Sequence, residues 1–126
     1  MDIEKYRQLI QSIIEKHSSC GSDEDEIETQ IACDLKRDRY LMFHVGWRGE
    51  RRVYGCVIHI DIKEDKIWIQ RDGTEVGIAN QLIAAGVPKS DIVLGYRSPY
   101  MRKFTPVSSG LGDRPSPTLV FDEPYN

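Results

Sequence analysis

The sequence predicts a single α+β domain: a mostly antiparallel sheet meander with one helix before it and a second helix after its fourth strand. Apolar residues recur every three or four positions in the first 17 residues, and a similar pattern follows Gly73. Between them, apolar and polar residues alternate in short runs joined by polar turns. The 126 residues, 40% hydrophobic and 29% charged, suit one domain whose core needs no disulfide or metal.

The first segment has the pattern of an amphipathic helix. Its apolar stripe follows a helical spacing and consists of Ile3, Tyr6, Leu9, Ile10, Ile13, Ile14 and His17. Asp2 is expected to cap its start, and residues 18–21 to end it. The acidic run 22–26 that follows is predicted to be a solvated loop, because adjacent like charges resist compact structure.

Four strands are expected next, as an antiparallel meander with short polar connections. The predicted strands are 27–33, 40–45, 53–62 and 67–70, and the turns between them are 34–38, 46–50 and 63–66. The third strand is apolar on nearly both faces, which is typical of a central strand.

A second helix is predicted from Thr74, its expected cap, to Ala85, with Gly86 and Pro88 ending it. A short fifth strand is expected over 92–96. The composition changes after Thr105, so we divide the chain into a domain, 1–105, and a Pro/Ser/Gly-rich tail, 106–126. Within the tail, 119–121 is apolar enough to pair with a sheet edge.

The net charge of −3 is unevenly distributed along the chain. Residues 1–33 carry 8 acidic and 3 basic residues, whereas 34–105 carry 9 acidic and 13 basic residues. An acidic total argues against a protein that coats phosphates, although the basic middle leaves room for a small contact site. The absence of a long apolar run, and three cysteines without paired spacing, predict a cytoplasmic protein with free thiols and no membrane span.

The best enzymatic candidate in the sequence is the cluster of Cys56, His59 and Asp61. On a regular strand, residues three apart point to opposite faces, so Cys56 and His59 should not form a nucleophile–base pair. His59 and Asp61 should share a face. His17, His44 and His59 show no paired metal-ligand spacing, and His44 could meet His59 only across strands. We therefore expect no catalytic residue, no cofactor and no metal.

Two segments place basic residues between aromatic ones. Their candidate partner-binding residues are Trp47, Arg48, Arg51 and Arg52 in the first, and Arg97, Tyr100, Arg102 and Lys103 in the second. Trp, Tyr and Arg are enriched at the energetic centres of interfaces, and the same mixture can stack on bases. The alternative is that the arginines lie on solvated turns and the aromatic side chains cap the core. We expect the two segments to form one contact face for an acidic partner.

The run 46–63, GWRGERRVYGCVIHIDIK, together with KIWIQ at 66–70, DGTE at 72–75, GVPK at 86–89, DIVLG at 91–95 and PYMR at 99–102, closely resembles the XisI family. These are the fdxN element excision controlling factor proteins of cyanobacteria. The resemblance extends over residues 1 to about 105 and also includes YRQLI at 6–10 and IETQ at 27–30. The tail from Pro106 departs from the family pattern.

The resemblance implies a regulatory protein associated with excision of a DNA element in heterocyst development. Family members act beside a site-specific recombinase and a companion, XisH, that resembles restriction-type nucleases. No catalytic residues are recognised in the family, so none is carried over. We expect an accessory factor that binds an XisH-like partner, with self-association as a homodimer left open and DNA contact weak or indirect. The alternative is a small DNA-binding recombination directionality factor. It is disfavoured because the second predicted helix has no Lys or Arg to read a groove.

Overall fold

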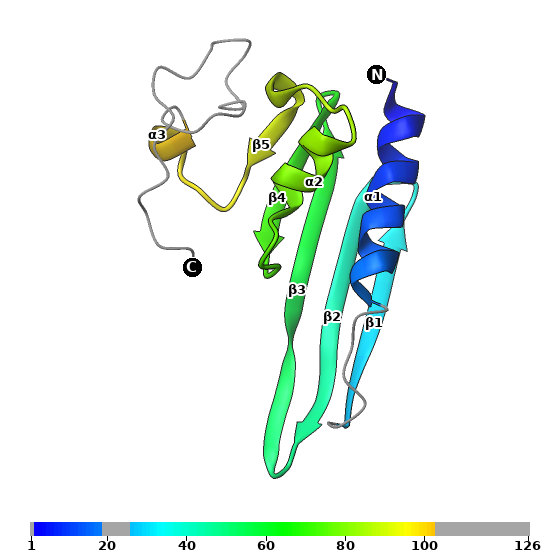
Figure 1. Ribbon diagram of the computed structural model, residues 1–126, viewed down its shortest axis with the longest axis vertical. Coiled ribbons are helices and arrows are strands. Elements are labelled where there is room, and N and C mark those ends of the chain that lie inside the picture. Colours follow the sequence, from blue (N-terminus) through cyan, green and yellow to red (C-terminus); the bar gives the residue numbers. More distant parts are fainter. Residues whose placement is uncertain (1, 19–25, 103–126) are drawn as a thin grey trace.

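The computed structural model describes residues 2–18 and 26–102 (Figure 1). Five strands form one sheet in the order β1-β2-β3-β4-β5, antiparallel except that β4 and β5 are parallel. The elements in chain order are α1 (Ile3–Ser18), β1 (Glu26–Asp34), β2 (Arg39–Arg48), β3 (Arg51–Lys63), β4 (Lys66–Asp72), α2 (Ile78–Ala84), the 3₁₀ turn η1 (Lys89–Asp91), β5 (Ile92–Leu94) and α3 (Pro99–Arg102). The predicted α+β class, the meander and the central third strand are confirmed.

Helices α1 and α2 pack on the same face of the sheet, α1 over β1 and β2 and α2 over β4 (Figure 1). The core lies between the two layers. It joins both helices to alternate residues of the central strands, and its fully buried members include Tyr6, Ile10, Ile14, Tyr40, Ile58, Ile60, Ile67, Ile69, Ile78 and Leu82. We call the opposite side of the sheet the open face, because in the described part of the chain α1 and α2 leave it uncovered.

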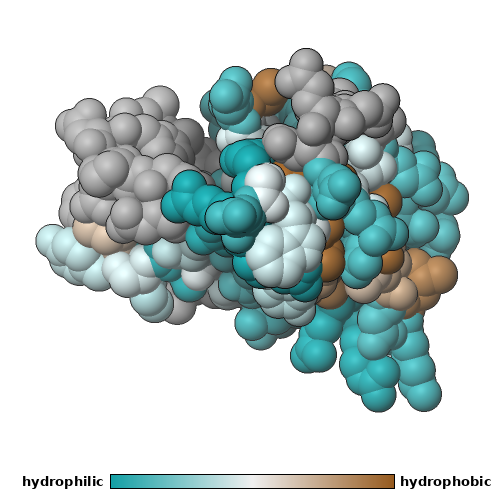
Figure 2. All heavy atoms as spheres, turned by 90° about the horizontal axis from the view of Figure 1, so that it is seen from below, coloured by the Kyte–Doolittle hydropathy of each residue, from teal (hydrophilic) through white to brown (hydrophobic). Residues whose placement is uncertain are grey.

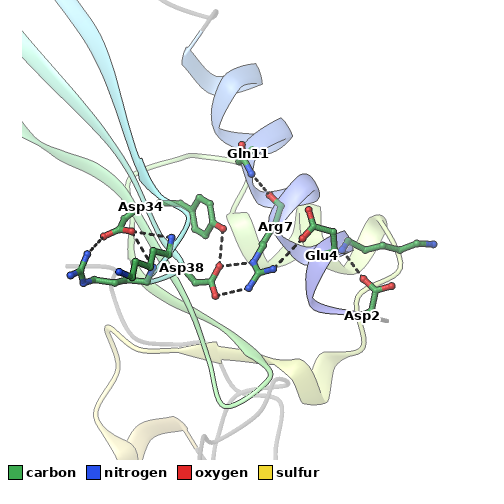
Figure 3. A network of polar contacts seen from close by, with 10 residues as sticks. Asp2, Glu4, Arg7, Gln11, Asp34 and Asp38 are labelled. Carbon is green, nitrogen blue, oxygen red and sulfur yellow. Dashed lines mark hydrogen bonds and ion pairs between the residues drawn. The ribbon is translucent and has the colours of Figure 1, made fainter.

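A polar network ties α1 to the turn between β1 and β2 (Figure 3). Arg7 donates to both carboxylate oxygens of Asp38, at 2.7 and 3.2 Å, and this pairing lowers the pKa of Asp38. Asp38 also accepts from the hydroxyl of Tyr40, whose pKa is raised to about 12, chiefly by burial. At the start of the helix Asp2 accepts from the amide of Lys5 at 2.9 Å, as the predicted cap should.

The start of α2 differs from the prediction. The helix begins at Ile78 rather than at Thr74, and its first amide donates to the carboxylate of Asp72 at 2.7 Å. The same carboxylate accepts from the amide and hydroxyl of Thr74, so it organises the whole connection from β4 to α2. Asp72 is buried beside the core, and these hydrogen bonds offset the cost of burying its carboxylate. Thr74 instead accepts from the amide of Gly77.

The β2–β3 hairpin is longer than predicted. Residues 46–48 belong to β2 and not to a turn, and the turn is confined to residues 49–50 between the opposed Arg48 and Arg51. Gly46 makes this extension feasible, because a Cβ there would lie 2.0 Å from the carbonyl oxygen of Glu26 on β1. A glycine that looks like a turn signal in the sequence therefore marks a close approach of two strands.

Two irregularities interrupt the register. Met42 is opposite Ile58 whereas Phe43 is opposite Cys56, so Val57 is an extra residue in β3. A second shift on the β4 side leaves Gln70 without an opposite residue in β3. The short α3 was not predicted, and β5 ends at Leu94 rather than at residue 96. The predicted acidic loop 22–26 is wrong at its last residue, since Glu26 begins β1. Residues 22–25, Cys20 and the tail with its apolar 119–121 lie outside the described residues.

Candidate partner-binding surface

The first predicted segment lies at the free end of the β2–β3 hairpin, at the lower end of Figure 1. Trp47 and Tyr54 are 45% and 69% exposed, and the arginines of this segment are exposed as well. The guanidinium carbon of Arg52 lies 5.3 Å from the ring centre of Trp47 and 5.9 Å from that of Tyr54. One of its nitrogens donates to the carbonyl of Gly46 at 3.4 Å. The arginine is thus held against two aromatic rings while it remains accessible.

The hairpin presents positive charge on both sides of the sheet. Arg52 is opposite Trp47, and both lie on the open face. Arg48 and Arg51 are opposite each other and lie on the side of the helices, since they alternate with Trp47 and Arg52 along their strands. Figure 2, which views the molecule from this end, shows side chains of intermediate hydropathy (white) and hydrophobic ones (brown) among hydrophilic ones (teal).

The second predicted segment is organised differently. Arg102 is half-buried, and its guanidinium donates to the carbonyls of Leu94, Gly95 and Arg97 at 2.9–3.4 Å. It also lies 5.1 Å from the ring centre of Trp68, and burial lowers its pKa. These donors stabilise the chain reversal between β5 and α3, so Arg102 has a structural role. Tyr100 is 62% exposed, Arg97 lies against the ring of Tyr96, and Lys103 is outside the described residues.

The two segments do not form one compact face. Trp68, which Arg102 covers, is opposite Asp61, nine residues along β3 from Arg52. At about 3.3 Å per residue, the two arginines are separated by roughly 30 Å along the sheet. Figure 1 likewise shows α3 far from the hairpin end. The expectation of one joint face is therefore wrong, because β3 is long and the segments lie at opposite ends of it.

The bulge at Val57 also corrects the argument about Cys56 and His59. Cys56 is opposite Phe43 and His59 is opposite Leu41, so both lie on the open face. His44, at an alternate position of β2, lies on the side of the helices and cannot meet His59. The extra residue in β3 reverses the expected alternation, and no sequence signal marked it.

In this cluster the thiol of Cys56 is nonetheless not hydrogen-bonded to His59, as a nucleophile would be to its base. His59 and Asp61 share a face, as predicted, and they are joined by a direct hydrogen bond of 3.0 Å, while Asp61 also accepts from Gln70. The thiol of Cys56 donates to the carbonyl of Ile58 at 3.2 Å, and burial raises its pKa, which opposes formation of a thiolate nucleophile. Cys56 and Cys33 are free thiols. Across residues 2–18 and 26–102, no three His, Cys, Asp or Glu side chains are grouped so that they could hold a metal ion.

A comparison with protein-family models identifies the family of this chain. The model described as "XisI protein" matches residues 1–108. The chain belongs to the XisI family. The match ends close to the boundary at residue 105 that we predict for the domain, and it leaves most of the tail outside.

Solved structures of other family members share the fold. A XisI-like protein from Anabaena variabilis ATCC 29413 is 41% identical, with a TM-score of 0.79, over 85% of this chain and 98% of that chain. The fdxN element excision controlling factor XisI from the same organism is 35% identical, with a TM-score of 0.71, over 82% of this chain and 95% of that chain. Among curated proteins, none matches the sequence. Within the described part of this XisI-family chain, no helix is long and apolar enough to cross a membrane.

Proposed function

We propose that this chain is a non-enzymatic accessory factor that controls excision of a DNA element, or a related process, by binding a protein partner of the XisH type. The observation that carries the proposal is the family match over residues 1–108, together with the similarity to an fdxN element excision controlling factor. The contacts of the Cys56 cluster support a role without catalysis, because its thiol donates to the carbonyl of Ile58 instead of to His59, and burial disfavours the thiolate.

The hairpin end is the surface best suited to the partner. Its arginines are exposed and close together, so they would accelerate association with an acidic surface and select against basic ones. Trp47 adds a large, partly exposed ring next to these charges, the kind of side chain that anchors interfaces. By contrast, Arg102 donates hydrogen bonds to backbone carbonyls, and we therefore exclude it from the candidate surface.

Direct reading of DNA is a weaker alternative. Helix α2 carries no basic residue, and its Ile78 and Leu82 are buried in the core against the sheet. On α1, Arg7 is engaged by Asp38 and Glu4. The helices therefore offer few donors to a groove, which a DNA reader needs. We expect duplex binding by the isolated chain to be weak and to be lost by about 200 mM salt.

The test is co-purification of the tagged chain with an XisH-like protein, followed by titration of the two purified proteins. We expect Arg48→Glu combined with Arg51→Glu to weaken that complex at least about tenfold, because two attractive charges become repulsive. Lys36→Glu combined with Lys89→Glu is the matched control, since both lysines are exposed and lie outside the hairpin. Equal binding by the two double variants, or tight sequence-specific DNA binding at 200 mM salt, would contradict the proposal.

A further inference from the structure

The open face near the hairpin end has a pattern of charge that repeats across the strands. Residues opposite one another in the register form rows on this face. Starting at the hairpin end, the rows across β1, β2 and β3 are Glu26, Trp47 and Arg52, then Glu28, Val45 and Tyr54, then Gln30, Phe43 and Cys56. The β1 side of the first two rows is therefore acidic, the β3 side carries Arg52, and aromatic or apolar side chains lie on and beside the middle strand.

We propose that this part of the open face binds the same face of a second copy of the chain. A twofold axis between two facing sheets, close to the direction of β2 but tilted from it, places β1 of each copy over β3 of the other. Glu26 of each copy then meets Arg52 of the other, and Trp47 meets its own counterpart near the axis. Such a contact is isologous, and the face is complementary to itself in charge. This inference does not depend on which hetero-partner or process the chain serves.

The aromatic content of the face suits burial in such a contact. Tyr54 and Trp47 are 69% and 45% exposed, and Phe43 lies beside Tyr54 with ring centres 6.4 Å apart. Facing sheets pack about 10 Å apart through side chains of this size. Arg52 is already held by the two rings and by the carbonyl of Gly46, so little side-chain entropy remains to be lost on association.

The same geometry limits the contact to the hairpin half of the sheet. At the other end of the face the row is Asp34, Arg39 and Asp61, and the twofold axis would bring Asp34 over Asp61 and Arg39 over Arg39. These like charges repel. Two twisted sheets that cross at about 30° diverge away from their closest approach, which keeps such pairs apart. The closest approach is thus expected at the rows of Trp47 and Tyr54.

The test uses the full chain and measures its mass by sedimentation across a dilution series. We expect a concentration-dependent dimer. Arg52→Glu alone and Glu26→Arg alone should each weaken it at least about 100-fold, because both symmetric pairs become repulsive. Lys36→Glu, an exposed charge reversal in the β1–β2 turn, should leave the dimer unchanged. Thermal melting checks that each variant is folded.

Mixing the two single variants gives the decisive result. An arginine at position 26 of one chain can meet a glutamate at position 52 of the other, and the second pair retains its natural charges, so a heterodimer should form at close to wild-type affinity. No heterodimer from folded single variants, or a wild-type chain that stays monomeric at every concentration, overturns the proposal. If the wild type is monomeric and Tyr54 is nevertheless protected from hydroxyl-radical labelling, residues 103–126 are the occupant instead. If Tyr54 becomes protected only in a hetero-complex, the face belongs to that other protein.

Discussion

Two segments of this chain contain arginine next to aromatic residues, and the fold uses them in opposite ways. At the hairpin end, Arg52 lies on exposed rings and donates a single weak bond to a carbonyl. Near α3, Arg102 donates to three carbonyls and covers a tryptophan that is 8% exposed. The same residue types therefore build an accessible surface in one place and hold a chain reversal in the other. What separates the two cases is whether the donors of the guanidinium are already satisfied within the chain.

We expect the largest difference in stability between the two segments when the tryptophan that lies against each arginine, Trp68 or Trp47, is replaced by alanine. Trp68→Ala should lower the free energy of unfolding by about 3–5 kcal/mol, because it leaves a cavity under Arg102 and Lys63, which both lie against its ring. Trp47→Ala should cost the monomer less than about 1 kcal/mol, since its ring is 45% exposed and lies outside the core. Urea unfolding of both variants, at a protein concentration too low for the proposed dimer, measures the difference. Comparable losses would contradict the distinction between a structural and a surface segment.

A second, smaller effect concerns the arginines themselves. Arg102→Ala should destabilise the fold by about 1–3 kcal/mol, because the carbonyls of Leu94, Gly95 and Arg97 lose a charged donor. Arg52→Ala should change the free energy of unfolding of the monomer by no more than about 0.5 kcal/mol. Thermal melts of the two variants, run beside the wild type, are sufficient. A more stable Arg102→Ala variant would show that burying this charge costs more than its hydrogen bonds return.

The smallest expected effect concerns a third arginine, Arg7. It resembles Arg102 because its guanidinium donates hydrogen bonds within the chain, to Asp38 and Glu4. Asp38→Asn should cost about 1 kcal/mol near neutral pH, a figure kept low because the pair is partly solvated. Since Arg7 lowers the pKa of Asp38 in the folded state, the contribution of the pair is complete above the unfolded pKa of about 4. It is lost as the pH falls through the lower, folded pKa.

The stability gap between wild type and Asp38→Asn should therefore close below about pH 4. Denaturant unfolding at a series of pH values measures this gap. Asparagine is a suitable replacement, because position 38 has a φ of 55°, which asparagine tolerates well. A gap that persists undiminished at low pH would show that the substitution acts through the backbone conformation instead of the ion pair.

Much of the fold follows from the sequence because its strongest signals are local. The periodicity of α1, the alternation in β1 and the doubly apolar β3 each depend on neighbouring residues, and the structure confirms the element that each one predicts. The errors have a different origin. The placement of Gly46 in a strand, the capping of α2 by Asp72 and the extra residue at Val57 all depend on which segments meet in space. None of these contacts is encoded in adjacent residues.

The candidate surface was only half predictable for the same reason. The hairpin residues are exposed, and exposure of charged residues next to a turn is the usual outcome. The burial of Arg102 depends on a reversal between β5 and α3 that brings the carbonyls of Leu94 and Arg97 to its side chain. Both segments have the same kind of composition, so the sequence predicts partner binding for each of them. Only the three-dimensional contacts distinguish them.

The bulge at Val57 determines which side of the sheet each residue of the outer hairpin faces. On one side of it Ile58 and Ile60 point into the core, and on the other side Cys56, Tyr54 and Arg52 point away from it. If Val57 were instead paired regularly, opposite Phe43, then Arg52 and Tyr54 would turn toward the helices, and Val53 would turn outward, without any change in the sequence of the hairpin. The surface that this protein offers at its far end thus depends on one residue being left unpaired in the middle of its longest strand.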